Sequence, residues 1–190
     1  VREYVQSLGL GDTLVKLYGR WDKASDIDWD RLPNQFVLKV NNGCGDILIC
    51  RDKDKLDKAT VIDTYDRLVS IKYGDVTGEP HYARIQPCVI AEELLDINKQ
   101  SINTSSLIDY KVWCLNGKPY CIWCAWNRGK EGADTGVYDL DWNYHPEWSV
   151  FTEHYRQGKE ILPKPKCFER MLEVASKLSE EFPILRVDLY

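Results

Sequence analysis

A glycine-rich turn between two apolar runs places the strongest constraint on how this chain folds. Residues 33–49 read PNQFVLKVNNGCGDILI, with Lys39 near the end of the first apolar run. Two apolar runs flanking such a turn predict a β-hairpin. A turn with little side-chain bulk can present backbone N–H groups to an anion, and a lysine on the preceding strand adds a point charge. The pattern predicts an anion-binding hairpin, with a purely structural turn that needs positive φ as the alternative.

Known phosphate-binding motifs arrange these residues differently. In the P-loop the lysine follows the glycines and opens a helix, whereas Lys39 precedes the glycines and a strand follows them. The segment does not match a dinucleotide fingerprint either. The hairpin alone therefore does not decide the function.

Composition excludes some classes of partner. The net charge is −5 over 190 residues, and no long basic cluster is present, which argues against nucleic acid. No apolar run approaches the roughly 20 residues that cross a bilayer, so no membrane span is expected. The sequence opens at Val1 inside a stretch that already reads as a helix. We expect the natural protein to begin earlier, which leaves a removed leader open.

Seven cysteines are present, and most lie within apolar, strand-like runs. Cys121 and Cys124 form a CxxC pair, but no second pair and no histidine at ligand spacing accompanies it, so a zinc site is not favoured. Reduced, buried thiols in a cytoplasmic protein are the simpler interpretation.

Two small lobes of mixed helix and strand are expected, an α+β class with antiparallel sheets. A helix-and-strand segment (1–32) precedes a first lobe (33–95), and a polar hinge (96–105) leads to a second lobe (106–190). Lobes joined by a hinge commonly bind a ligand between them. In the first lobe, apolar spacing predicts a helix over residues 54–73 with Asp54 as its N-cap. A short strand is expected at residues 14–18.

Asn116-Gly117 predicts a second tight hairpin. Closing on that turn pairs Leu115 with Lys118, Trp113 with Tyr120, and Lys111 with Ile122, and it places Asp109 and Lys111 on one face. A polar loop (127–136) that precedes residues 138–142, a helix (168–182) and a last strand (184–190) are expected to follow. That last strand carries Arg186 and Asp188.

Six segments, in this order, resemble the ATP-grasp superfamily, and most closely its TupA-like branch, which is associated with bacterial cell-surface polysaccharide synthesis. They are VREYV, LPNQFVLKVNNGCGD, VIAEELL, IDYKVWCLNGKP, VYDLDWN and FPILRVDLY. Together they span nearly the whole chain. The resemblance implies the ATP-grasp fold, with two α+β lobes and a nucleotide cleft between them, and it implies ATP and Mg²⁺ as cofactors.

The resemblance also assigns roles to single residues. Lys39 is similar to the lysine that contacts the nucleotide phosphates, and Lys111 to a second cation over them. Glu92, Glu93 and Leu94 resemble the strand end where adenine docks, read by main-chain groups of Glu93 and Leu94 and by a carboxylate. Asp109 resembles the acceptor of ribose hydroxyls. The turn that closes over the phosphates corresponds to Asn42, Gly43, Cys44 and Gly45. The branch commonly shows His-Gly-Ser-Gly-like residues there, so the cysteine removes one good hydrogen-bond donor.

Arg186 and Asp188 resemble the arginine and the first magnesium ligand of the closing strands. Magnesium bound to nucleotide phosphates needs only a few carboxylates and keeps water for its other positions. In the family, a glutamate and an asparagine that complete the site come shortly after this point. We therefore expect those ligands beyond Tyr190, and reduced nucleotide binding or turnover by this piece alone.

The activity implied is an ATP-dependent carboxylate–amine ligase reaction through an acyl phosphate. Lys39, Lys111 and Arg186 would stabilise charge on the phosphates, and no covalent nucleophile is needed. A kinase, a glycosyltransferase-associated protein of polysaccharide synthesis and a non-catalytic nucleotide-binding module are the alternatives. Association with other enzymes of surface-polysaccharide synthesis is possible, and the oligomeric state stays open.

The residues that recognise the acceptor are the least constrained by the sequence. Arg128 could hold a substrate carboxylate, and Asp139 and Asp141 could receive an amine or sugar hydroxyls. A loop salt bridge or a turn cap is the alternative for all three. The aromatic side chains of residues 138–151 could stack on a sugar ring or pack beneath a long loop.

Overall fold

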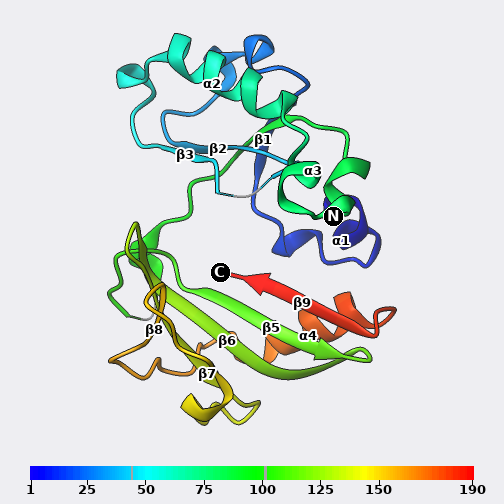
Figure 1. Cartoon of the computed structure of the whole chain (residues 1–190), viewed down its shortest axis with the longest axis vertical. Coiled ribbons are helices and arrows are strands. Elements are labelled where there is room, and N and C mark those ends of the chain that lie inside the picture. The colour runs from blue at the N-terminus through cyan, green and yellow to red at the C-terminus, as the bar shows by residue number, and fades with distance from the viewer. Residues whose placement is uncertain (44, 101) are drawn as a thin grey trace. The chain divides into compact units, whose positions relative to one another are not determined.

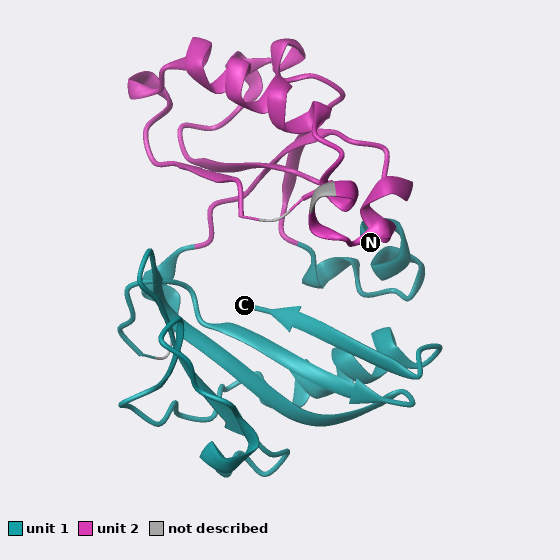
Figure 2. Cartoon of the chain, viewed as in Figure 1, with its two compact units in different colours: residues 1–14, 96–190 teal, residues 15–95 magenta. Residues whose placement is uncertain are grey.

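The computed structural model describes residues 1–43, 45–100 and 102–190. The chain divides into two compact units, one formed by Val15–Leu95 and the other by Val1–Leu14 together with Asp96–Tyr190 (Figure 2). Each unit combines a mainly antiparallel sheet with a few helices (Figure 1). The α+β class expected from the sequence is confirmed.

The unit Val15–Leu95 is built on a four-stranded antiparallel sheet in the order β1-β4-β2-β3. Its strands are β1 (Leu17–Trp21), β2 (Phe36–Val40), β3 (Ile47–Cys50) and β4 (Val89–Glu92). Its helices are α2 (Lys58–Ser70) and α3 (Tyr73–Thr77), with 3-10 helices at Ala24–Asp26, Trp29–Arg31, Lys53–Lys55 and Pro80–Arg84. Strand β1 begins three residues later than the expected strand at 14–18.

The predicted glycine-turn hairpin is present as β2 and β3, with Lys39 directly opposite Ile47. Alternate residues of β2, namely Phe36, Leu38 and Val40, are buried in the core of this unit. Tyr65 of α2 packs in the same core and donates a hydrogen bond from its hydroxyl to the carbonyl of Leu38 at 2.8 Å. Helix α2 therefore covers one face of the sheet, and Lys39 lies on the opposite face.

The start of α2 differs from the expectation. Asp57, not Asp54, caps the helix, because its carboxylate accepts hydrogen bonds from the Thr60 backbone N–H at 3.2 Å and from the Thr60 hydroxyl at 2.6 Å. These hydrogen bonds hold the pKa of Asp57 below its ordinary value. Asp54 lies in the preceding 3-10 helix, Lys53–Lys55. Both aspartates have cap-like spacing in the sequence, and the local turn selects the second.

The other unit contains a five-stranded sheet in the order β8-β7-β6-β5-β9. Its strands are β5 (Asp109–Leu115), β6 (Lys118–Gly129), β7 (Gly132–Tyr138), β8 (Tyr155–Gln157) and β9 (Ile184–Leu189). All pairs are antiparallel except β7 with β8. The helices are α1 (Arg2–Ser7) and α4 (Phe168–Ser179), with 3-10 helices at Gly11–Thr13, Ile97–Lys99 and Pro146–Trp148.

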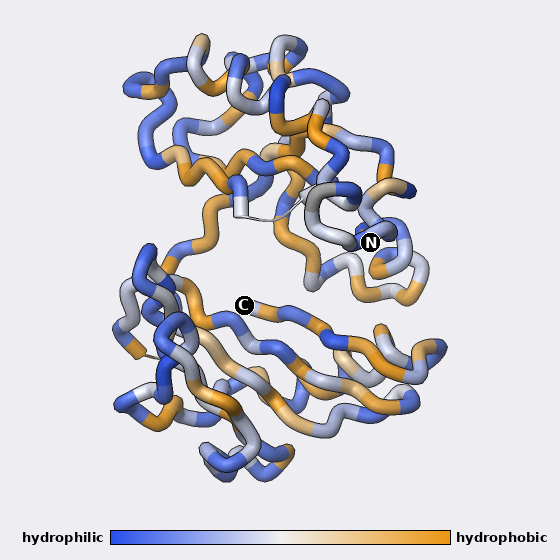
Figure 3. The backbone as a smooth tube through the Cα atoms, in the orientation of Figure 1, coloured by the Kyte–Doolittle hydropathy of each residue, from blue (hydrophilic) through white to orange (hydrophobic). Residues whose placement is uncertain are grey.

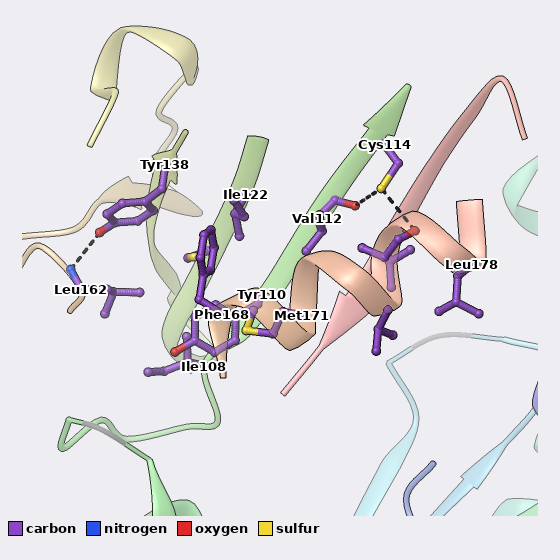
Figure 4. Close-up of a cluster of buried hydrophobic side chains, with 14 of the residues drawn as sticks. Ile108, Tyr110, Val112, Cys114, Ile122, Tyr138, Leu162, Phe168, Met171 and Leu178 are labelled. Carbon is purple, nitrogen blue, oxygen red and sulfur yellow. Dashed lines mark hydrogen bonds between the residues drawn. The ribbon is translucent and has the colours of Figure 1, made fainter. Parts of the chain in front are cut away.

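Helix α4 covers one face of this sheet. Its Phe168, Met171 and Leu178 recur at helical spacing and pack with Tyr110 and Val112 of β5 (Figure 4). The buried Cys114 thiol donates to the carbonyls of Val112 and Ala175 at 3.9 and 3.7 Å (Figure 4). Because strand side chains alternate between faces, the odd-numbered positions of β5 lie on the side of the sheet away from α4.

The first fourteen residues belong to this same unit, although the sequence led us to expect a separate segment of residues 1–32. Val5 and Leu10 are buried in its core. The Tyr4 hydroxyl donates to the carbonyl of Leu178 at 3.0 Å, and its ring meets Phe182 edge-on. These contacts join positions more than 170 residues apart, which explains why local sequence patterns do not indicate them.

Two expectations about the second hairpin were wrong. Leu115 pairs with Lys118 as expected, but a register shift between Trp113 and Cys114 moves Trp113 opposite Cys121 and Lys111 opposite Trp123. The bulge adds one residue to β6, so pairs beyond it differ from those of a regular antiparallel ladder. The expected loop at 127–136 was also wrong, because β6 and β7 occupy most of it.

The small residues of β7 explain why the sequence indicated a loop at 127–136. Gly132 has φ +115°, and a Cβ there would collide with the carbonyl of His154. Ala133 and Thr135 are fully buried. Gly-Ala-Asp-Thr-Gly reads as a polar loop, but here it is a strand whose short side chains allow close packing.

Hydrophobic residues follow the strands, and many of the connecting loops are hydrophilic (Figure 3). Within the described residues, no helix combines the length and apolar character required to span a membrane. The described cysteines are free thiols, and Cys50, Cys88, Cys114 and Cys124 are buried. Cys44 lies outside the described residues.

Candidate functional site

An ion pair lies on the face of the β1-β4-β2-β3 sheet away from α2. The ammonium of Lys39 on β2 is 2.6 Å from a carboxylate oxygen of Glu92 on β4. Lys39 pairs across the strands with Ile47 and Ile90. Ile47 is 58% exposed, so an apolar surface adjoins the charged pair.

The base of the glycine turn is held by two asparagine side chains. Asn41 accepts a hydrogen bond from the Cys88 backbone N–H at 2.8 Å and donates one to the Gln86 carbonyl at 2.9 Å. Asn42, which is buried, donates to the Ile71 carbonyl at the end of α2 at 3.2 Å. Gly45 has φ +91°, a conformation that glycine adopts without strain. The turn is thus tied at its base to two neighbouring segments.

The Asn42 side chain also has an unusual acceptor. Its Oδ1 is buried and has no hydrogen-bond partner among the residues that the structure describes. A cavity of about 10 Å³ beside it is bordered by Val40, Leu68 and Tyr73. A space of this size is close to the volume that admits a single water molecule. Asn41 was missed by the sequence reasoning, although the Asn-Asn pair before the glycine was a usable signal.

The segment after β4 is anchored through its backbone. The Glu93 N–H donates to the carbonyl of Lys16 at 2.9 Å. This hydrogen bond continues the pairing between β1 and β4 by one residue. Leu94 follows directly and is half-buried.

Five charged side chains form a row on the face of the other sheet away from α4. We call it the charged row; along it the side chains alternate in sign, and in order they are Arg128, Asp109, Lys111, Asp188 and Arg186. The ammonium of Lys111 lies between the two carboxylates, 2.8 Å from Asp109 Oδ2 and 2.7 Å from Asp188 Oδ2. Arg128 Nη2 reaches Asp109 Oδ2 at 3.2 Å. At the other end, Arg186 contacts Asp188 at 2.7 Å.

Strand pairing explains why these residues meet. Lys111 on β5 is directly opposite Asp188 on β9. Asp109 and Arg186 are each two residues from a member of that pair and so project to the same face. The sequence-based prediction that Asp109 and Lys111 share a face is borne out by their ion pair. Arg128 joins them from β6, beyond a register shift between Trp126 and Gly129, so its partner was not predictable from spacing.

The electrostatics of the row favour charged side chains. Burial raises the pKa of Asp188, but hydrogen bonds from Arg186 and Lys111 outweigh burial, and its pKa lies below the ordinary value. The pKa of the Arg186 guanidinium is raised, chiefly by its hydrogen bond to Asp188. Lys111 is only 14% exposed. With three cations and two carboxylates, the row carries one net positive charge.

One acceptor in the row is unsatisfied. Oδ1 of Asp109 is buried without a hydrogen-bond partner among the described residues. A buried acceptor in this state costs free energy, on the order of 1–3 kcal/mol, unless a donor or a cation reaches it. Asp109 is therefore the position in the row where a ligand hydroxyl, a water molecule or a metal ion would gain most.

The whole sequence matches the model of one protein family. The model for the TupA-like ATP-grasp family matches residues 1–190, the whole chain. The chain belongs to the TupA-like ATP-grasp family. No curated protein sequence and no solved structure matches it.

In a TupA-like ATP-grasp protein the charged row fits nucleotide phosphates and magnesium. Lysine and arginine are the side chains that bind phosphate oxygens. Magnesium is commonly held by one or two carboxylates together with substrate phosphates, and Asp188 with the unsatisfied Asp109 offers such donors. Among the described residues no group of three or more metal-ligating side chains is present. Two carboxylates, Asp109 and Asp188, leave the other coordination positions to phosphate oxygens and water, which is the usual arrangement of magnesium bound together with phosphates.

The remaining candidates for acceptor binding lie in a structured turn. Asp139 accepts hydrogen bonds from the backbone N–H groups of Asp141 and Asn143 at 2.9 and 2.7 Å, and its other oxygen is 3.1 Å from His145. The hydrogen bonds, chiefly those from Asn143, lower the pKa of Asp139 to about 2. Asp139 thus organises its own loop.

The aromatic side chains of residues 138–151 form one stretch in the sequence, but they lie in different environments in the structure. Tyr138 is fully buried, and its ring stacks on Trp142. Its hydroxyl accepts a hydrogen bond from the Leu162 N–H at 2.8 Å (Figure 4). Trp148 is 45% exposed. Trp113, missed by the sequence reasoning, lies under the Arg186 guanidinium at 5.7 Å from the ring centroid.

Proposed function

We propose that this chain is an ATP-dependent carboxylate–amine ligase of the ATP-grasp type that acts in the cytoplasm in the synthesis of a bacterial cell-surface polymer. Membership of the TupA-like family supports the ATP-grasp part of this proposal. The observation that carries it is the charged row, in which Lys111 bridges Asp109 and Asp188 with an arginine at each end.

Each proposed contact with ATP follows from side-chain chemistry. In the unit Val15–Leu95 we assign Lys39 and the glycine turn to phosphates, and Glu92 with the main chain of Glu93 and Leu94 to the base. The exposed apolar side chain of Ile47 beside the ion pair of Lys39 and Glu92 suits contact with the planar ring of the base. Lys39 would exchange its contact with Glu92 for one with phosphate.

In the other unit we assign Lys111 and Arg186 to phosphates, Asp109 to ribose hydroxyls, and Asp188 to magnesium. Magnesium, when bound, neutralises phosphate charge and acts as a Lewis acid on the transferred phosphoryl group. The unsatisfied Oδ1 of Asp109 needs a donor, and a hydroxyl supplies one.

The proposed reaction has two steps. A carboxylate oxygen of one substrate attacks the γ-phosphorus of ATP, the bond to the β–γ bridging oxygen breaks, and an acyl phosphate and ADP form. An amine then attacks the acyl carbon, inorganic phosphate leaves, and the amine loses a proton as the amide forms. Both steps depend on positioning and charge stabilisation, for which Lys39, Lys111 and Arg186 provide positive charge.

Arg128 is the best-supported contact for the acceptor carboxylate. Its guanidinium lies at one end of the charged row and is 42% exposed, so it can take a second anionic partner. A sugar acid or a peptide carboxylate has the required charge.

The first prediction concerns Lys39. Replacing it by alanine, Lys39→Ala, removes a charged contact to phosphate and is expected to weaken ATP binding in the presence of Mg²⁺ by about 10- to 100-fold. Lys55→Ala is the matched control, because Lys55 is an exposed lysine of the same unit paired with Asp52 at 3.0 Å. Isothermal titration calorimetry measures both affinities.

An unchanged affinity in Lys39→Ala, or an equal loss in Lys55→Ala, contradicts the assignment. To separate a ligase from a kinase, ADP release is measured with pairs of carboxylates and amines. ADP release that needs both substrates supports the ligase. Release with a hydroxyl acceptor alone indicates a kinase, and tight ATP binding without any release indicates a nucleotide-binding module.

A further inference from the structure

Asp188 is fully engaged by cations of its own unit. Arg186, two residues earlier on β9, donates from Nε to Oδ1 over 2.7 Å and from Nη2 to Oδ2 over 3.0 Å. Lys111 Nζ donates to Oδ2 over 2.7 Å. Both oxygens of the carboxylate therefore accept charge-assisted hydrogen bonds, two of them from one guanidinium in a forked arrangement.

These three hydrogen bonds use three of the roughly four lone-pair sites of the carboxylate, so a divalent cation would compete with them for the same two oxygens. Magnesium binds a carboxylate oxygen at about 2.0–2.1 Å, closer than either nitrogen of Arg186. A guanidinium and a divalent ion on the same two oxygens repel each other strongly at such short range. We propose that Arg186 occupies the metal position of Asp188 and must leave it before a divalent ion can bind there. This inference rests on the proposed function for the identity of the metal and the nucleotide.

The surroundings of Arg186 allow it to move. Its side chain is 45% exposed, so water can solvate the guanidinium once it leaves Asp188. Lys111 is different, because it is 14% exposed and contacts two carboxylates. Only Arg186 can leave Asp188 while the rest of the row keeps its pairing.

The exchange couples the two ligands. A phosphate group binds a guanidinium through two hydrogen bonds, so a nucleotide draws Arg186 away and exposes Asp188 to the metal. A ligand that favours the released state raises the affinity of the other, and the effect is reciprocal. Metal alone is therefore expected to bind weakly, and metal and nucleotide are expected to bind cooperatively.

The test uses Mn²⁺ alone as the probe, with free Mn²⁺ measured by electron paramagnetic resonance. Arg186→Gln is expected to bind Mn²⁺ about tenfold more tightly than the unmodified chain, because a competing positive charge is gone. The control is Arg156→Gln, an equal charge change at an arginine 46% exposed and 3.6 Å from Asp134, with no change expected. Adding Asp188→Asn to Arg186→Gln should abolish the gain.

Unchanged or weaker Mn²⁺ binding in folded Arg186→Gln overturns the inference. A second measurement needs no variant: the Nε–H signal of Arg186 in the unmodified chain is followed by NMR during titration with Mg²⁺. The signal is expected to move as the ion pair opens. A stationary signal while the Asp188 carboxyl carbon shifts also overturns the inference.

Failure of the proposed function gives a different result. If Arg186→Gln gains Mn²⁺ affinity but the unmodified chain does not bind ATP, the placement of Arg186 stands and the ligase proposal fails. If the unmodified chain binds ATP with Mg²⁺ and releases ADP with a carboxylate and an amine, but Arg186→Gln gains no Mn²⁺ affinity, the ligase proposal stands and this inference fails.

Discussion

Lys111 connects the two halves of the charged row, because its ammonium contacts both Asp109 and Asp188. Its position was predictable, since alternation along a strand places Asp109 and Lys111 on one face whatever the exact register. The partners of Arg128 and Asn41 were not predictable, because a strand irregularity brings Arg128 to Asp109 and a distant segment brings Cys88 to Asn41. Sequence spacing identifies the face of a strand better than it identifies cross-strand partners.

At the residue scale, Gly132 is expected to tolerate no side chain. Gly132→Ala places a Cβ against the carbonyl of His154 at a φ of +115°, so either the β7–β8 pairing or the backbone must distort. We expect the free energy of unfolding to fall by roughly 2 kcal/mol or more. Urea denaturation followed by circular dichroism measures it.

Gly129 provides the matched control at the other side of the same turn. A Cβ there meets nothing within 4 Å, so Gly129→Ala should change stability by less than about 1 kcal/mol. Equal effects of the two substitutions would show that close packing at β8 is not the cause.

At the scale of single elements, the hairpins and the longer helices α2 and α4 were predicted with small errors, and α3, β7 and β8 were missed. The errors have local causes: the bulge at Trp113 and Cys114, the choice between two capping aspartates, and a strand of small residues. After β7, Asp139 folds the chain into a turn by accepting backbone hydrogen bonds from Asp141 and Asn143. Short polar side chains compete with strand pairing in this way.

The turn after β7 predicts a pH dependence. His145 contacts Glu147 Oε1 through Nδ1 at 2.8 Å and Asp139 Oδ2 through Nε2 at 3.1 Å, and its ring stacks on Trp148. Hydrogen bonds to Glu147 and then Asp139 raise the pKa of His145 above 6.5. Its stabilising contribution is therefore complete below pH 6.5 and disappears as the pH rises through the higher pKa of the folded state.

Asp139 has the opposite dependence. Its pKa is lowered from 3.8 to about 2, so its contribution is present above pH 3.8 and is lost as the pH falls toward 2.

NMR titration of the imidazole signals tests the raised pKa of His145. His145→Gln assigns the signal among the three histidines, and Asp139→Asn should lower the pKa of His145. A pKa of His145 at or below 6.5 contradicts the arrangement.

At the scale of the whole molecule, two α+β units follow from the order of the sequence patterns, but the membership of the first fourteen residues does not. Val5 and Leu10 are buried in the same core as Phe168 of α4, although more than 150 residues separate them in the sequence. Family membership adds what neither pattern nor packing supplies, the expectation of a nucleotide. The central claim is that this chain binds ATP with Mg²⁺ through the charged row.

Calorimetric titration of ATP in the presence of Mg²⁺ tests that claim most directly. The chain should bind ATP, Lys111→Met should weaken binding by about 10- to 100-fold, and Lys118→Met, at an exposed lysine of the same sheet, should leave it unchanged. Circular dichroism checks that both variants fold. Absence of ATP binding by the unmodified chain, or equal affinities of folded Lys111→Met and Lys118→Met, would contradict the account.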